Sequence, residues 1–163
     1  MATEAQTTST SPLAAAQSRP LDERELRAWR GMLRVHATLT KALDAELEAA
    51  HGLPLSSYEV LLHLDNAEGH RMRMSDLAAM AILSRSGLTR LVDRLERQGL
   101  LRRERCASDA RGLFAEITDE GRGVFAEARK THLDGVRRLF LDRFSRDELR
   151  SIGALWEKVG TAG

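Results

Sequence analysis

Arginine and hydroxyl side chains recur along residues 84–99, SRSGLTRLVDRLERQG, at spacings that gather them on one face of a helix. At about 100° per residue, this polar face and its flanks comprise Ser86, Thr89, Arg90, Asp93, Arg94 and Arg97. The opposite face is an apolar stripe made of Leu88, Leu91, Val92 and Leu95. Arg, Ser and Thr donate hydrogen bonds to base edges in the major groove of DNA. The segment therefore predicts a helix that buries one stripe and reads a duplex with the other.

Within this helix, three side chains are expected at base edges: Ser86, Thr89 and Arg90. Arg90 is the candidate for guanine, because a guanidinium donates two hydrogen bonds to O6 and N7. Further contacts to bases or phosphates are expected from Ser84, Arg85 and Arg94. Upstream, Arg73 and Ser75 are expected to hold phosphates through a charge and a helix N-terminus.

The charge of the chain is concentrated on this region. Residues 71–111 contain ten Arg and five acidic residues, whereas the whole chain has a net charge of +1. A local positive excess is the electrostatic signature of a phosphate-binding segment. The alternative is a solvated basic helix on an ordinary helical protein, and the agreement of several local patterns favours DNA binding.

Neighbouring segments predict the elements that must position the reading helix. SDLAAMAIL predicts a first short helix with Ser75 as its N-cap, and the second helix begins at Ser84 and stops at Gly99. Next, LLRRERC and LFAEIT predict two strands joined by the polar loop ASDARG, residues 107–112. RMRM before the first helix fits a third strand or an extended lead-in. Two helices followed by a hairpin predict a winged helix-turn-helix.

The segments RMRMSDLA, LSRSGLTRLVDRLERQGLLRRE and SDARGLFAEITDEGR resemble the winged-helix core of MarR-type transcriptional regulators. The resemblance extends over residues 21–160, because long helices flank the core. It implies an obligate homodimer on a pseudopalindromic operator, often released by a small ligand or an oxidant. It also implies that Arg111 enters the minor groove and that Asp109 orients nearby arginines. Without the resemblance, SDARG reads equally well as a polar loop facing water.

The predicted fold class is mainly α with a small antiparallel β-wing (α+β), with long dimerisation helices at both ends. Residues 1–20 predict a disordered leader, and residues 21–163 a single MarR-like domain. Within it, residues 21–52 and 119–163 are assigned to dimerisation and residues 55–118 to DNA binding. The alternative is that the terminal helices pack only on their own domain. Capping pairs predict helix starts at Asp22/Glu25, Ser56/Glu59 and Ser145/Glu148. Thr118 is expected to cap a further helix that reaches about Phe144.

Other chemistry is sparse. The single Cys106 stands near several arginines, which favours a redox-sensing alternative, although a lone Cys is more often an apolar filler. Trp29 and His36, two turns apart, are candidates for an effector pocket for a phenol or aromatic carboxylate, unless Trp29 is simply core. No metal site, cofactor, membrane span or enzyme motif is expected, and the chain is expected to be cytoplasmic. A winged helix used only for protein contacts, or for dimerising an enzyme, fits the arginine-rich face less well.

Overall fold

The computed structural model describes residues 19–80, 85–106 and 109–160, with the side chains of residues 85, 106 and 109–112 left out of the description. The chain comprises two compact units, residues 1–37 and 38–163. The first unit contains the N-terminal part of the long helix α2 (Glu23–His51). All other described elements belong to the second unit. The predicted leader falls almost wholly on residues 1–18, outside the described part of the chain.

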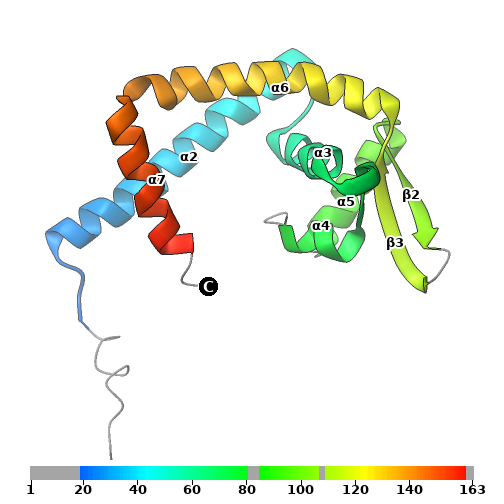
Figure 1. The fold of residues 1–163 in the computed structure, drawn as a ribbon, viewed down its shortest axis with the longest axis horizontal. Coiled ribbons are helices and arrows are strands. Elements are labelled where there is room, and N and C mark those ends of the chain that lie inside the picture. Colours follow the sequence, from blue (N-terminus) through cyan, green and yellow to red (C-terminus); the bar gives the residue numbers. More distant parts are fainter. Residues whose placement is uncertain (1–18, 81–84, 107–108, 161–163) are drawn as a thin grey trace, which may run out of the picture. The chain divides into compact units, whose positions relative to one another are not determined.

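The second unit contains the winged helix-turn-helix (Figure 1). Its elements, in order, are α3 (Leu55–Asn66), η1 (Glu68–His70), β1 (Arg71–Arg73), α4 (Met74–Met80), α5 (Arg85–Arg97), β2 (Leu101–Cys106), β3 (Asp109–Ile117), α6 (Asp119–Leu139), η2 (Leu141–Arg143) and α7 (Arg146–Gly160). The three strands form one antiparallel sheet in the order β1-β3-β2. The predicted fold class, including the third strand in RMRM, is confirmed.

The core is built from the apolar stripes of α3, α4 and α5, closed by the base of the sheet and by α6. The predicted stripe of α5 is confirmed, since Leu88, Leu91, Val92 and Leu95 are all buried. The residues that anchor the other elements in this core include Leu47, Val60, Leu61, Leu64, Leu77, Leu101, Ala115 and Phe125. Burial of one stripe fixes the rotation of α5 and therefore which side chains it exposes.

Two predicted helix boundaries on the path from α5 to α6 are confirmed. Gly99 has a φ of +74°, which only glycine adopts without strain, and it ends α5. The amide of Leu100 donates to the carbonyl of Leu95, and that of Gly99 donates to Glu96, the hydrogen-bond pair of a Schellman motif. Thr118 caps α6, because its hydroxyl accepts from the amide of Gly121 at 3.0 Å. The wing therefore leaves and re-enters the helical core at fixed points.

The predicted capping boxes at the outer helices have different outcomes. Asp22 with Glu25 at the start of α2 and Ser145 with Glu148 at the start of α7 each exchange the expected hydrogen bonds. The box at Ser56 is wrong. Helix α3 begins at Leu55, and the Asp44 carboxylate on α2 accepts from the Leu55 amide at 2.8 Å. Helix α3 therefore begins one residue before the predicted cap, and a side chain from the preceding helix binds its first amide.

Three other predicted boundaries are corrected. Helix α4 begins at Met74, so Ser75 lies in its first turn, where its hydroxyl donates to Asp76 Oδ1 rather than capping the helix. The predicted loop 107–112 is too long, because β3 begins at Asp109, which pairs with Cys106 across a bulge. Helix α6 ends at Leu139, not near Phe144, because the backbone leaves helical geometry at Phe140. No Pro or Gly marks that end in the sequence.

Candidate nucleic-acid interface

The outer face of α5 presents hydrogen-bonding side chains from a helix whose other face is fixed in the core. Ser86, Thr89 and Arg90 are exposed, as the spacing predicts. In the part of the chain that the structure describes, no hydrogen bond or ion pair engages the Arg90 guanidinium. A guanidinium on a rigid helix, with its donors uncommitted, can form a bidentate contact at little cost in reorganisation.

Helices α4 and α5 meet at a shallow depression of about 240 Å³. It is lined by Met74, Ser75, Ala78, Leu88 and Thr89. The depression brings together two predicted contact residues, Ser75 and Thr89, from the two helices of the motif. On α5, Ser86 and Thr89 are both exposed and stand one turn apart. Together, α4 and α5 could contact a phosphate oxygen of the DNA backbone and the edge of a base.

Strand β1 carries two arginines that flank one aromatic ring. The guanidinium carbons of Arg71 and Arg73 lie 5.4 Å and 5.3 Å from the centroid of the Phe114 ring. Arg73 pairs directly with Phe114 across the β1–β3 ladder. The same residues line a groove of about 550 Å³, together with the acidic residues Glu68 and Asp76. Cation–π contacts hold both positive charges beside the start of α4.

Arg94 has a partner that its spacing does not reveal. Its Nη2 donates to Ser57 Oγ at 2.6 Å, and Ser57 is fully buried on α3. A donor that satisfies a buried hydroxyl contributes to the packing of α5 on α3. Arg94 is therefore held within the core contact, whatever else its remaining donors do.

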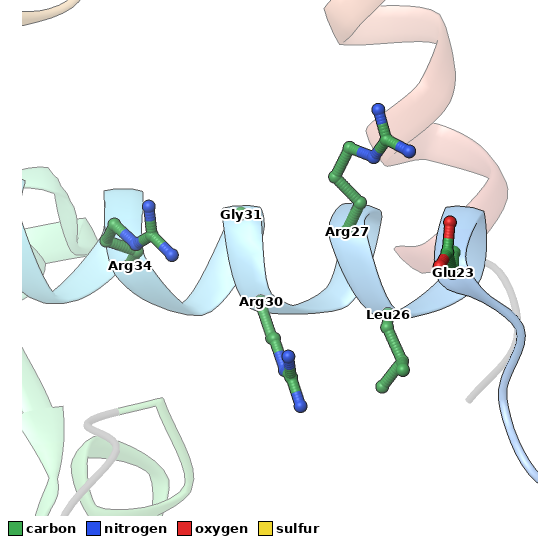
Figure 2. Close-up of a pocket in the computed structure, with 6 residues that line it drawn as sticks. All are labelled: Glu23, Leu26, Arg27, Arg30, Gly31 and Arg34. Atoms are coloured by element: carbon green, nitrogen blue, oxygen red, sulfur yellow. The ribbon is translucent and has the colours of Figure 1, made fainter.

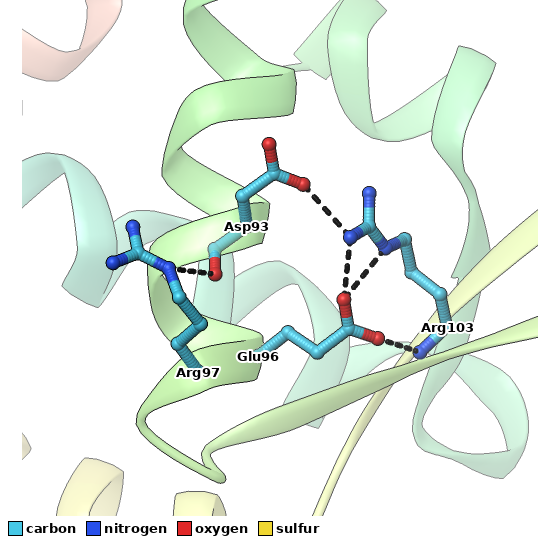
Figure 3. A network of polar contacts seen from close by, with 4 residues as sticks. All are labelled: Asp93, Glu96, Arg97 and Arg103. Atoms are coloured by element: carbon cyan, nitrogen blue, oxygen red, sulfur yellow. Dashed lines mark hydrogen bonds and ion pairs between the residues drawn. The ribbon is translucent and has the colours of Figure 1, made fainter.

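A polar network joins α5 to the wing (Figure 3). Arg103 on β2 donates from Nε to Glu96 Oε2 at 2.9 Å and from Nη2 to Asp93 Oδ1 at 2.8 Å. Its backbone amide donates to the other oxygen of Glu96 at 3.1 Å. The hydrogen bond from Arg103 is the main cause that lowers the pKa of Glu96, and the hydrogen bond to Glu96 likewise raises the pKa of Arg103. No spacing rule predicts this network, because its residues come from a helix and a strand that meet only in the fold.

The neighbouring arginine of the wing has a different arrangement. Arg102 faces Glu116 directly across the β2–β3 ladder and donates to it at 2.9 Å, with Glu104 at 3.4 Å. This ion pair stays within the sheet, whereas that of Arg103 crosses to α5. Both guanidinium groups stand against carboxylates. A charge count over residues 71–111 therefore overstates the number of arginines available to phosphates.

Several predicted site residues fall outside what the structure describes. Ser84 lies in the undescribed stretch 81–84. Arg85 begins α5, Cys106 ends β2, and Asp109 and Arg111 lie in β3, but the side chains of these four residues are outside the description. Their roles in DNA binding and, for Cys106, in redox sensing stay predictions. Among the described residues, no cluster of His, Cys, Asp and Glu is arranged to hold a metal ion.

The two residues proposed for effector binding, Trp29 and His36, are both exposed on the N-terminal part of α2. The same stretch carries a groove of about 450 Å³ (Figure 2). Its lining is rich in arginine and consists of Glu23, Leu26, Arg27, Arg30, Gly31 and Arg34. Within the described residues, no helix is both long and apolar enough to cross a bilayer.

Comparisons with known proteins converge on one group. The model of the MarR family matches residues 51–112. The crystal structure of AbsC, a MarR family transcriptional regulator from Streptomyces coelicolor, is 38% identical, with 88% of this chain and 97% of that chain covered and a TM-score of 0.82. Sco3205, a MarR family regulator from the same organism in complex with DNA, is 37% identical, with 87% and 89% covered and a TM-score of 0.82. The homoprotocatechuate degradative operon repressor of Escherichia coli is 29% identical over 139 residues, which cover 79% of this chain and 92% of that protein.

Proposed function

The chain belongs to the MarR family of transcriptional regulators, and from this premise we propose that it is a homodimeric repressor of a pseudopalindromic operator. The observation that carries the proposal is the outer face of α5, where the exposed Arg90 has no hydrogen bond or ion pair within the described residues and the helix itself is fixed in the core. Two relatives support it by name, since Sco3205 is in complex with DNA and the Escherichia coli protein is an operon repressor. The members of this family are regulators and not enzymes.

In this proposal α5 enters the major groove and the wing follows the adjacent minor groove. Base edges are contacted by Ser86, Thr89 and Arg90, and bases or phosphates by Ser84, Arg85 and Arg94. Arg73 and Ser75 hold phosphates beside the first turn of α4. At the wing, Arg111 enters the minor groove and Asp109 orients nearby arginines.

The second proposed feature is the homodimer. Residues 21–52 and 119–163 would form the dimerisation part and residues 55–118 the DNA-binding lobe. Large apolar side chains are exposed on both terminal helices, and they include Trp29, Leu33, Leu155, Trp156 and Val159. Such side chains favour burial against a second copy. In a two-fold dimer, the two α5 helices would reach half-sites about 10 base pairs apart.

The third proposed feature is release by a small phenol or aromatic carboxylate bound near Trp29 and His36. An exposed indole offers a stacking surface, and the neighbouring arginines of α2 offer partners for a carboxylate. The name of the Escherichia coli relative links that protein to the degradation of an aromatic acid. A ligand of this class is therefore the first to test.

Gel-shift titration of genomic promoter fragments against bulk competitor DNA, repeated over a range of salt, tests the proposal. We expect sequence-dependent binding that weakens steeply with salt, because counterions are released from the phosphates. Footprinting of the bound fragment should show two half-sites. Aromatic carboxylates are then titrated into the complex. Equal affinity for every duplex, at all salt concentrations, would contradict the proposal.

A further inference from the structure

Arg103 on β2 joins the wing to α5 through polar contacts. Its backbone amide and its guanidinium both bind Glu96, and Nη2 of the guanidinium, which also contacts Glu96, reaches Asp93 (Figure 3). Asp93 and Glu96 stand one turn apart on α5, so the contacts fix two points along the helix. Contacts from backbone and side chain together restrict both the distance and the angle between β2 and α5.

The position of Arg103 along the strand makes that angle important. Three residues of β2 follow it before the strand ends at Cys106, a length of roughly 10 Å at the usual rise per residue. A rotation of about 10° at Arg103 would move that end by roughly 2 Å. Hydrogen bonds tolerate changes of only a few tenths of an ångström. A wing that pivots this far cannot make its groove contacts while α5 keeps its own.

We propose that Arg103 is a positioning residue for operator recognition, which holds the wing at a fixed angle to α5 without itself contacting DNA. The inference rests on the proposed function. Glu96, the partner of Arg103, holds the other end of this contact. It does so although it is an acidic residue beside a DNA-binding face. Arg103 is only 26% exposed, and its Nη2 already binds two carboxylates. These facts favour an internal role over a phosphate contact.

The sign of one substitution separates the two roles. Removing an acidic side chain near a duplex strengthens binding when only charge matters, because repulsion of the phosphates decreases. If Glu96 instead holds the wing through Arg103, Glu96→Ala weakens operator binding. Random duplex depends on charge and not on the wing angle, so its affinity should be unchanged or slightly higher. The ratio of operator to random-duplex affinity is therefore the measurement.

The experiment compares Glu96→Ala, Arg103→Ala and the double variant with two matched controls from the same strand. Glu104→Ala removes an acid, and Arg102→Ala removes an arginine whose ion pair stays within the sheet. We expect Glu96→Ala and Arg103→Ala each to lower the operator-to-random ratio roughly tenfold. The double variant should be no weaker than Arg103→Ala alone. Each control should change both affinities by the same factor and leave the ratio unaltered.

Thermal unfolding of each variant checks that it is folded at the assay temperature. If Arg103→Ala is unfolded, Glu96→Ala decides alone, because alanine is favourable in a helix. The inference is overturned if Glu96→Ala binds the operator as tightly as the unmodified protein or more tightly. The inference is also overturned if the single variant Arg103→Ala weakens binding to operator and to random duplex by the same factor, because that result would identify a phosphate contact. An unmodified protein without operator preference would instead refute the proposed function.

Discussion

Gly121, in the first turn of α6, is the position where a single methyl group should distinguish close packing from helix propensity. A Cβ built on Gly121 would lie 1.9 Å from the carbonyl oxygen of Leu100 and 2.9 Å from Ile117 Cγ1. The Leu100 carbonyl also accepts from the amide of Thr118 at 3.1 Å. The helix start is thus pressed against the backbone that links α5 to the wing, and backbone cannot move aside as a flexible side chain can.

Two effects of opposite sign compete in Gly121→Ala. Replacing glycine by alanine within a helix usually stabilises by about 0.5–1 kcal/mol. The clash must separate α6 from Leu100 by about 1 Å, which costs roughly 2–4 kcal/mol through overpacking and the weakened hydrogen bond from Thr118. The clash prevails, and we expect a net loss of about 2–3 kcal/mol in the free energy of unfolding. For a chain of this size, that lowers Tm by roughly 5–12 °C.

Gly123→Ala is the matched control, because it lies two residues further along α6 and its Cβ would meet nothing within 4 Å. We expect this variant to be more stable than the unmodified protein by up to about 1 kcal/mol. Both variants are compared by urea and thermal unfolding at one protein concentration, since dimerisation would couple Tm to concentration. Equal stability of the two alanine variants would refute the claim that contact with Leu100 requires glycine.

Three further predictions concern the reading helix, a half-buried histidine and the terminal helix. Arg90→Ala should weaken operator binding by about 1–3 kcal/mol and relax sequence preference without changing Tm; an equal loss on random duplex in the same titration would indicate a phosphate contact only. The ring of His132 stacks on that of Tyr58, with 4.5 Å between the ring centroids. Its Nδ1 is buried and has no hydrogen-bond partner among the described residues, and burial lowers the pKa of His132. Stability should therefore decrease as pH falls below about 6.5, because the unfolded chain takes up the proton first. In thermal unfolding between about pH 7.5 and 5.5, His132→Phe should flatten the dependence of Tm on pH. An unchanged dependence would assign the titration to another group. Trp156→Glu should place a charge in the proposed dimer interface and shift the mass measured by sedimentation towards one chain, and a mass that stays dimeric would remove α7 from that interface.

Sequence reasoning succeeded where the deciding interaction is local. The stripe of α5 follows from helical period, and the end of α5 follows from Gly99, whose backbone conformation excludes other residues. Thr118 and the pair Ser145/Glu148 likewise cap their own helices within three residues. Each of these signals is complete within one turn of chain. The order of elements and the fold class follow from them.

Two features that the sequence does not reveal depend on a partner distant in sequence. Ser56 carries the sequence signature of a cap, but α3 begins at Leu55, whose amide donates to Asp44, eleven residues earlier. Arg94 lies on the flank of the predicted DNA-binding face, yet it satisfies a buried serine thirty-seven residues away. No spacing rule connects such pairs. They become visible only when the packing of α2, α3 and α5 is known.

The arginines of this chain show why composition alone does not define a DNA-binding site. A local excess of positive charge attracts any duplex, and it acts whether or not each arginine has a carboxylate beside it. Discrimination between sequences needs donors held at fixed positions. Arg102 and Arg103 donate to carboxylates within the protein, whereas no hydrogen bond or ion pair binds Arg90 in the described part of the chain. The same residue type therefore serves attraction, scaffold geometry and reading, and only the contacts of each guanidinium tell which of the three it performs.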